Sequence, residues 1–278
     1  MKQKLLFLGI LTILFNYGFS QDTKVSLDET QSSWLKSEFV NDEFLIKSYI
    51  PANLSIPKDS LPILFVLDAD MSFAMTYDIV RWLRWGNEIP EVAIIGIAYG
   101  KTQAEWWQKR SRDYTTCQDK SEMWGKWELA GGGENFIKFL ENELIPNIKN
   151  QYNLKSSNRT IIGLSFGGLI STDILFSKPE LFKNYIIVGP ALQWNDKQVF
   201  KREEKFAQEN KNLDVVVYTS VGSLDFENIL NPWKEFNNVV LGRNYENLNY
   251  KTEIIENESH LSMFPTALTK GLKYVLNE

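Results

Sequence analysis

The sequence is poor in cysteine and histidine, with one residue of each among 278. Cys117 therefore cannot form a disulfide within the chain. The common zinc sites need several Cys and His ligands, so the composition argues against them as well. The sequence also lacks G-x-G-x-x-G and any glycine-rich loop that ends in Lys-Ser/Thr. These absences leave no usual metal or nucleotide motif, and we expect a function that needs no cofactor.

Basic residues are also in the minority, with 30 Lys and Arg against 35 Asp and Glu and a net charge of −5. This balance argues against nucleic acid, or an anionic membrane surface, as a partner. A hydrophobic share of 44% with 23% charged residues is typical of a folded protein. The length suits one large domain with an ample core.

The N-terminus has the pattern of a secretory signal peptide. Two lysines precede an apolar run over 5–15, and the small residues Gly18 and Ser20 follow it. The run is too short for a comfortable membrane span. We predict cleavage before Gln21, with an uncleaved anchor as the alternative.

Two expectations follow from this cleavage. The mature protein, residues 21–278, is expected to be a single domain. It is also expected to be exported to the periplasm or the medium, without stable membrane association once the signal peptide over 1–20 is removed.

Short apolar runs alternate with helical patterns along most of the chain, which predicts a mainly parallel sheet covered by helices on both faces. An alternating segment over 33–49 with a turn at 41–43 predicts an antiparallel N-terminal hairpin. The predicted buried strands cover 61–67, 92–97, 159–163, 185–188, 213–219 and 252–255, and the predicted helices cover 73–85, 134–149, 169–177, 196–210 and 263–276.

The segment over 101–132 is the least regular, and it is rich in tryptophan. Its four indoles belong to Trp106, Trp107, Trp124 and Trp127. We expect at least half of them to pack at the edge of the core, and the alternative is an aromatic wall that lines a substrate pocket.

The pattern Gly163-x-Ser165-x-Gly167 stands between a predicted strand and a predicted helix. This is the context in which G-x-S-x-G forms a nucleophile elbow, with a strained serine at the apex of a sharp turn. Side chains at the two glycines are expected to collide with neighbouring backbone. The amide of Phe166 would then face an oxygen that becomes negative when Ser165 attacks a carbonyl. An ordinary glycine-rich turn is the alternative.

A serine nucleophile needs a base, and His260 is the one histidine available. It follows the last predicted strand, and Asp225 follows the strand before it. The chain order Ser, Asp, His is that of the α/β-hydrolases. Asp225 is favoured over Glu227 as the acid that orients the imidazole. The chemistry predicted from these parts is hydrolysis of a small-molecule ester through an acyl-enzyme.

The chain resembles the putative-esterase family of α/β-hydrolases, which includes esterase D-like enzymes, feruloyl and acetyl-xylan esterases, mycolyltransferases and siderophore esterases. The similarity spans nearly all of the mature chain. It lies in Leu-Asp-Ala-Asp over 67–70, Arg-Ser-Arg-Asp-Tyr-Thr over 110–115, the glycines at 131–133, the elbow, Gly-Ser-Leu-Asp over 222–225 and His260.

The resemblance implies that the amide of Asp70 is the second oxyanion donor. The family's usual Leu-Asp-Gly has Ala69 in its last position here. The segments at 110–115 and 131–133 look most like the siderophore-esterase branch, typified by enterobactin esterases. A carbohydrate esterase acting on feruloyl or acetyl groups, or an acyltransferase with the same triad, is the alternative. A binding module that has lost activity is disfavoured by the intact Ser, Asp and His.

Overall fold

The protein, seen here as a computed structural model, is described over residues 26–119 and 127–277. These residues form one eight-stranded sheet, in the order β1-β2-β4-β3-β5-β6-β7-β8. The strands are β1 (Thr30–Ser37), β2 (Asp42–Tyr49), β3 (Ile63–Val66), β4 (Ala93–Ala98), β5 (Arg159–Leu164), β6 (Asn184–Val188), β7 (Val216–Gly222) and β8 (Asn249–Ile255). β1 and β2 form an antiparallel hairpin, β2 pairs antiparallel with β4, and the remaining pairs are parallel. The predicted α/β class is confirmed.

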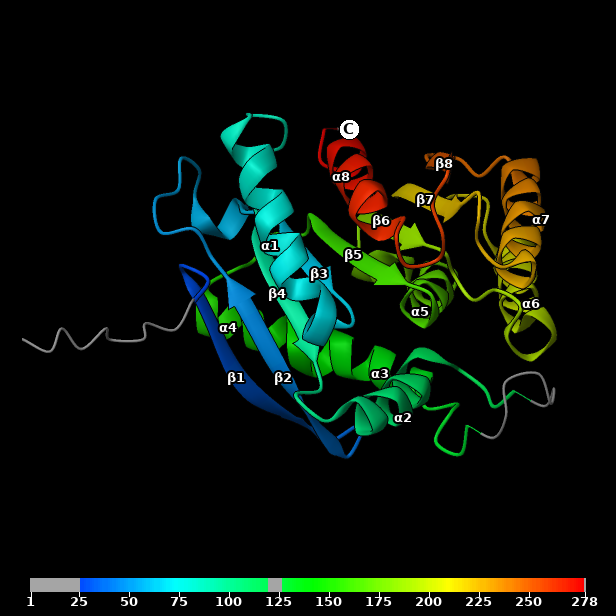
Figure 1. The fold of residues 1–278 in the computed structure, drawn as a ribbon, viewed down its shortest axis with the longest axis horizontal. Coiled ribbons are helices and arrows are strands. Elements are labelled where there is room, and N and C mark those ends of the chain that lie inside the picture. Colours follow the sequence, from blue (N-terminus) through cyan, green and yellow to red (C-terminus); the bar gives the residue numbers. More distant parts are fainter. Residues whose placement is uncertain (1–25, 120–126, 278) are drawn as a thin grey trace, which may run out of the picture.

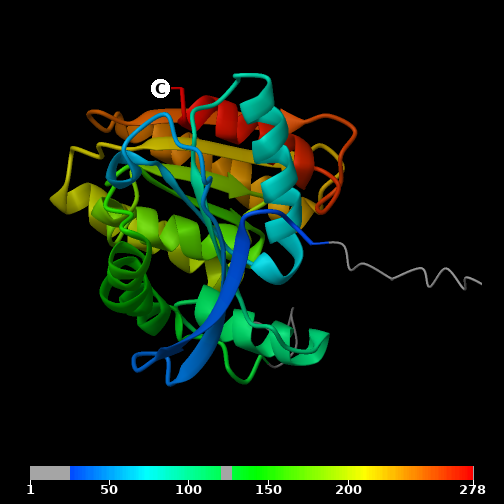
Figure 2. The same cartoon turned by 90° about the vertical axis from the view of Figure 1, so that its left-hand side faces the viewer.

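Helices cover both faces of this sheet. They are α1 (Ala69–Trp85), α2 (Gln103–Tyr114), α3 (Gly133–Phe139), α4 (Ile145–Tyr152), α5 (Phe166–Leu175), α6 (Trp194–Glu209), α7 (Glu227–Arg243) and α8 (Phe264–Val275). A π-helical turn, Leu140–Leu144, joins α3 to α4. One core cluster lies under α1 and α8, and the larger one lies under the other helices. Figures 1 and 2 show α1 and α8 on one side of the strands and α4 and α5 on the other.

Burial follows the position of each strand in the sheet. Every residue of β3, β4, β6 and β7 is buried, because helices cover both faces of these strands. In β2, by contrast, Phe44, Ile46 and Ser48 are buried and their neighbours are not. This alternation is what a strand near the edge of the sheet shows when one of its faces meets the core.

Two helices depart from the predicted pattern. The supposedly irregular segment over 101–132 contains α2, whose N-terminus carries a capping box between Thr102 and Glu105. Its periodicity was hidden because Arg110 and Asp113, both charged, face the interior. The sequence pattern indicated no element at 227–243, where α7 forms with Pro232 inside it. The helix predicted over 196–210 is present as α6, and Trp194, Val199 and Glu203 are buried on its inner side.

The tryptophans divide as expected. Trp106 is buried, Trp127 is half-buried against the core, and Trp107 is exposed. Trp124 and the predicted signal peptide over 1–20 lie outside the described residues. Within 26–119 and 127–277, no helix has the length and apolarity that a membrane span requires.

Asp173 is an ionisable group on the inner side of α5. Nε of Arg202 on α6 lies 2.8 Å from its Oδ1, and Thr116 Oγ1 donates to its Oδ2 at 3.1 Å. Burial raises the pKa of Asp173 to about 6, and these two partners offset the effect only in part. The carboxyl group thus takes up a proton in the folded protein at a pH where an unfolded chain has lost it.

We expect this group to lower the stability as the pH rises. Because the pKa is higher in the folded state, its contribution is fully favourable below pH ~4 and is lost as the pH passes ~6. The free energy of unfolding of wild type relative to Asp173→Asn should therefore fall by roughly 2 kcal/mol between pH ~4 and ~7. Urea unfolding at several pH values measures this difference. Asp214→Asn, at an exposed aspartate, serves as the control, and a pH-independent difference for Asp173→Asn would contradict the prediction.

Candidate active site

Ser165 lies at the apex of the turn between β5 and α5 with φ 59° and ψ −116°. Positive φ is uncommon for residues other than glycine and places local strain at the serine. Two backbone hydrogen bonds hold it, one from the Ser165 amide to the Val188 carbonyl at 3.0 Å and one from the Ala191 amide to the Ser165 carbonyl at 3.1 Å. The segment that follows β6 thus fixes the predicted nucleophile.

The two glycines of the motif differ in what they allow. A Cβ at Gly163 would lie 2.1 Å from the carbonyl oxygen of Gly167, which the backbone cannot tolerate. A Cβ at Gly167 would meet no atom closer than 3.5 Å, the nearest being Oδ2 of Asp68. The expected collision is therefore confirmed at Gly163 and wrong at Gly167, because the atoms nearest to a Cβ at Gly167, on Asp68 and Leu67, lie 3.5–3.7 Å away, which is ordinary van der Waals contact.

Asp225 and His260 are brought together from the ends of two neighbouring strands. Nδ1 of His260 lies 3.0 Å from both carboxylate oxygens of Asp225. The Asp225 side chain is inaccessible to solvent, whereas that of His260 is 15% exposed. The Phe226 amide also donates to Asp225 Oδ1 at 2.7 Å. Glu227, the other candidate acid, is the first residue of α7, and it is Asp225 that contacts the imidazole.

The imidazole also lies close to the segment that holds Ser165. A Cβ added to Gly189 would be 3.2 Å from Cε1 and 3.3 Å from Nδ1 of His260. Gly189 directly follows Val188, whose carbonyl accepts the hydrogen bond from Ser165. The turn after β6 is therefore in contact with the predicted nucleophile on one side and with the predicted base on the other.

The two predicted oxyanion donors lie in the first turns of two helices. Phe166 is the first residue of α5 and Asp70 is the second residue of α1. The first amides of a helix have no acceptor within the helix, and the helix dipole favours negative charge there. The Asp70 carboxylate accepts hydrogen bonds from the amides of Tyr99 and Gly100 at 2.7 and 2.8 Å. These contacts anchor the start of α1 to the end of β4.

A buried ion pair joins the two helix starts. Asp68, the N-cap of α1, has φ 52°, and its carboxylate accepts hydrogen bonds from Nε and Nη2 of Arg110 at 2.9 and 2.7 Å. Nη2 of Arg110 also lies 3.4 Å from the carbonyl of Leu164, the residue before Ser165. Arg110 is 3% exposed. One guanidinium group thus contacts both the β3–α1 turn and the β5–α5 elbow.

Aromatic rings enclose the same guanidinium group. Its Cζ lies 5.0–5.5 Å from the ring centres of Trp106, Trp107, Tyr114 and Phe166. Burial alone would lower the pKa of Arg110, but the Asp68 carboxylate outweighs burial and raises this pKa, so the group stays charged. In the sequence, Arg110 belonged to the segment over 110–115 that resembles the siderophore esterases, and no role was assigned to it. Nothing in its spacing from Asp68, far away in the chain, indicated that the two would pair.

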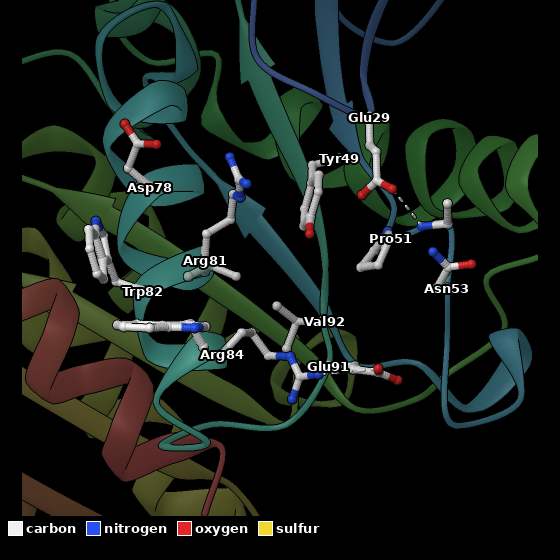
Figure 3. A pocket seen from close by; sticks show the side chains of 13 residues that line it. Glu29, Tyr49, Pro51, Asn53, Asp78, Arg81, Trp82, Arg84, Glu91 and Val92 are labelled. Atoms are coloured by element: carbon white, nitrogen blue, oxygen red, sulfur yellow. Dashed lines mark hydrogen bonds and ion pairs between the residues drawn. The ribbon is translucent and has the colours of Figure 1, made fainter.

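Four cavities of the described residues lie away from this site. The largest of the four has a volume of about 680 Å³ and lies beside the C-terminal half of α1. Figure 3 shows Arg81 and Trp82 of α1 on one side of it, with Tyr49 and Glu29 opposite. Ser165, Asp225 and His260 line none of the four. Over 26–119 and 127–277, no group of three or more His, Cys, Asp or Glu is placed to hold a metal ion.

A mainly parallel sheet with a strained serine after β5 is the architecture of an α/β-hydrolase. The comparison with protein families gives the same class: residues 37–264 match the family described as "Putative esterase". The chain belongs to this family. It is an esterase, an enzyme that hydrolyses esters on an α/β-hydrolase fold.

Similar proteins include several siderophore esterases. The ferri-bacillibactin esterase BesA of Bacillus subtilis (strain 168) is 28% identical over 240 residues, which cover 80% of this chain and 81% of BesA. The crystal structure of the BES protein from Bacillus cereus has a TM-score of 0.82 and 28% identity, covering 92% of this chain and 97% of that one. The siderophore hydrolase EstA from Aspergillus nidulans, with a TM-score of 0.76 and 17% identity over 92% of this chain and 98% of its own, shares the fold.

The two elbow glycines should respond differently to alanine. Gly163→Ala places Cβ against backbone that cannot move, and we expect a loss of about 4 kcal/mol or more in unfolding free energy. Gly167→Ala meets only ordinary contacts with Asp68 and Leu67, and inside a helix alanine is favoured over glycine by about 1 kcal/mol. Thermal unfolding of both variants measures the contrast. Equal destabilisation of the two proteins would contradict this geometry.

Arg110 should affect turnover more than substrate binding. Arg110→Lys keeps the positive charge but loses the two-point contact with Asp68, so the amides of Asp70 and Phe166 shift relative to each other. We expect kcat to fall about 100-fold with KM changed far less. Steady-state kinetics on a p-nitrophenyl ester measures both constants, with Arg81→Lys on the surface of α1 as the control. A folded Arg110→Lys enzyme with normal kcat would refute this role.

Proposed function

We propose that Ser165, His260 and Asp225 form a catalytic triad that cleaves carboxylic esters through an acyl-enzyme intermediate. The observation that carries the proposal is the contact of Nδ1 of His260 with Asp225, at a ring that packs beside the turn holding Ser165. An acid on Nδ1 leaves Nε2 as the atom that takes up the serine proton. The nearly inaccessible carboxylate orients the ring and stabilises the imidazolium that forms.

Each step of the proposed ester hydrolysis can be assigned to a chemical group of this chain. Ser165 attacks the ester carbonyl while His260 accepts its proton, and the carbonyl oxygen becomes an oxyanion. The amides of Phe166 and Asp70 donate hydrogen bonds to that oxygen. His260 then gives the proton to the leaving alcohol. A water molecule, deprotonated by the same imidazole, releases the acid and restores Ser165. If an acceptor alcohol took the place of water, the same groups would carry out acyl transfer.

We place the substrate among siderophore esters. BesA, whose name gives ferri-bacillibactin as its substrate, is similar over four fifths of both chains. A shorter match, 29% identical over 121 residues, is to a siderophore enterobactin esterase of Emericella nidulans. A siderophore triester is a small molecule with several ester bonds, which suits a site at the open edge of the sheet. Export to the periplasm or the medium is part of the proposal and rests on the signal-like sequence over 1–20.

Three variants test the triad. Ser165→Ala should lower kcat by about a million-fold if the three residues act as a unit, and Asp225→Asn by about ten-thousand-fold. Glu227→Gln, two residues away and clear of the imidazole, should keep wild-type activity and serves as the matched control. Turnover of p-nitrophenyl esters and of a catecholate triester gives the rates. A large loss in Glu227→Gln with little loss in Asp225→Asn would assign the acid to the other residue, and retained turnover in Ser165→Ala would end the proposal.

A further inference from the structure

Large apolar side chains are exposed to solvent at residues adjacent in the chain to Asp70, Asp225 and His260. Leu224 and Phe226 flank Asp225, and Leu261 follows His260. The exposed fraction of each of these three residues is 66%. Met71, which follows Asp70, is 67% exposed. Single exposed apolar residues are common on protein surfaces, but a group gathered at one site marks a surface that another molecule covers.

Three of these residues lie on two turns that are hydrogen-bonded to each other, and one of the three, Phe226, packs beside the imidazole. The β7–α7 turn and the β8–α8 turn are joined by a hydrogen bond from the Leu224 amide to the Glu258 carbonyl at 2.9 Å, and by another from the Asn257 amide to Ser223 Oγ at 2.8 Å. The ring of Phe226 is centred 6.0 Å from that of His260. We call Leu224, Phe226 and Leu261 the imidazole rim.

The position of the rim decides which half of an ester it meets. In the proposed mechanism His260 returns its proton to the leaving alcohol, so the alcohol oxygen must come within hydrogen-bonding distance of the imidazole. Groups that surround the imidazole therefore contact the alcohol part of the substrate. Met71 is excluded from the rim because it stands beside the predicted oxyanion donor, on the side of the ester carbonyl.

We propose that the imidazole rim binds the alcohol half of the substrate and selects esters whose leaving alcohol presents a bulky apolar surface next to the ester oxygen. This inference rests on the triad proposed above. A sugar alcohol would bring hydroxyl groups against three hydrocarbon side chains and lose hydrogen bonds to water. Among the candidate substrates, the rim thus favours esters of apolar alcohols over esters of carbohydrates.

Acetate esters with different alcohols test this selectivity at a constant acyl group. Methyl, hexyl and diethylene glycol acetates all release primary alcohols. Each methylene that is fully buried favours reaction by about fourfold. Because the rim is open on one side, we expect hexyl acetate to exceed diethylene glycol acetate in kcat/KM by about tenfold in the wild type.

The ratio of these two kcat/KM values is the readout in the variants, since it cancels any general loss of activity. Phe226→Ser and Leu261→Ser should each lower the ratio about threefold or more, and Phe226→Leu should restore most of it. The Phe226 amide that contacts Asp225 is retained in both substitutions at this position. Leu241→Ser, at an exposed leucine on α7, is the matched control and should leave the ratio unchanged.

Failure of this inference can be told apart from failure of the triad. If the wild type hydrolyses the acetates with no preference for hexyl, or if the rim variants keep the wild-type ratio, the rim has no role in selectivity while the triad stands. If the wild type hydrolyses none of these esters and a fluorophosphonate probe does not label Ser165, both proposals fall together.

Discussion

The ion pair between Arg110 and Asp68 is the contact on which the geometry of the candidate site depends. The first turn of α1 and the elbow before α5 come from distant parts of the chain, and each presents an amide at the same edge of the sheet. Arg110 contacts both segments, through the Asp68 carboxylate and through the Leu164 carbonyl. A buried ion pair adds little net stability, because desolvation offsets most of the attraction. Its value here lies in fixing the distance between two helix starts.

The surroundings of this pair explain why an arginine is used. The planar guanidinium group satisfies a carboxylate at two points and still offers its faces to aromatic rings. Four rings take up these faces, among them Phe166, whose amide is one of the predicted oxyanion donors. Trp106 and Trp107, from the tryptophan-rich segment, therefore pack against the guanidinium group that contacts the elbow. The same tryptophans can therefore pack at the edge of the core, as expected, and also contact a residue that holds the elbow.

The surroundings of Arg110 and of His260 differ in how far their apolar groups are exposed to solvent. Around Arg110 the aromatic rings are mostly buried, with Trp107 39% exposed, whereas Leu224, Phe226 and Leu261 beside Asp225 and His260 are each 66% exposed. The cavity of about 680 Å³ beside the C-terminal half of α1 is lined by neither Ser165 nor His260.

The sequence alone determined the fold class and the serine at a strand-to-helix turn, because both depend on local periodicity or on glycine at a tight turn. The proposed order Ser, Asp, His came from the places of Asp225 and His260 after predicted strands. The sequence could not place α7, in which Pro232 interrupts the usual helical pattern, or α2, in which charged residues occupy inward positions. Only the tertiary structure decided that Asp225 meets His260, that Gly163 is sterically required while Gly167 is not, and that Arg110 pairs with Asp68. These facts concern residues distant in the chain, and their distances are set by the packing of helices on the sheet.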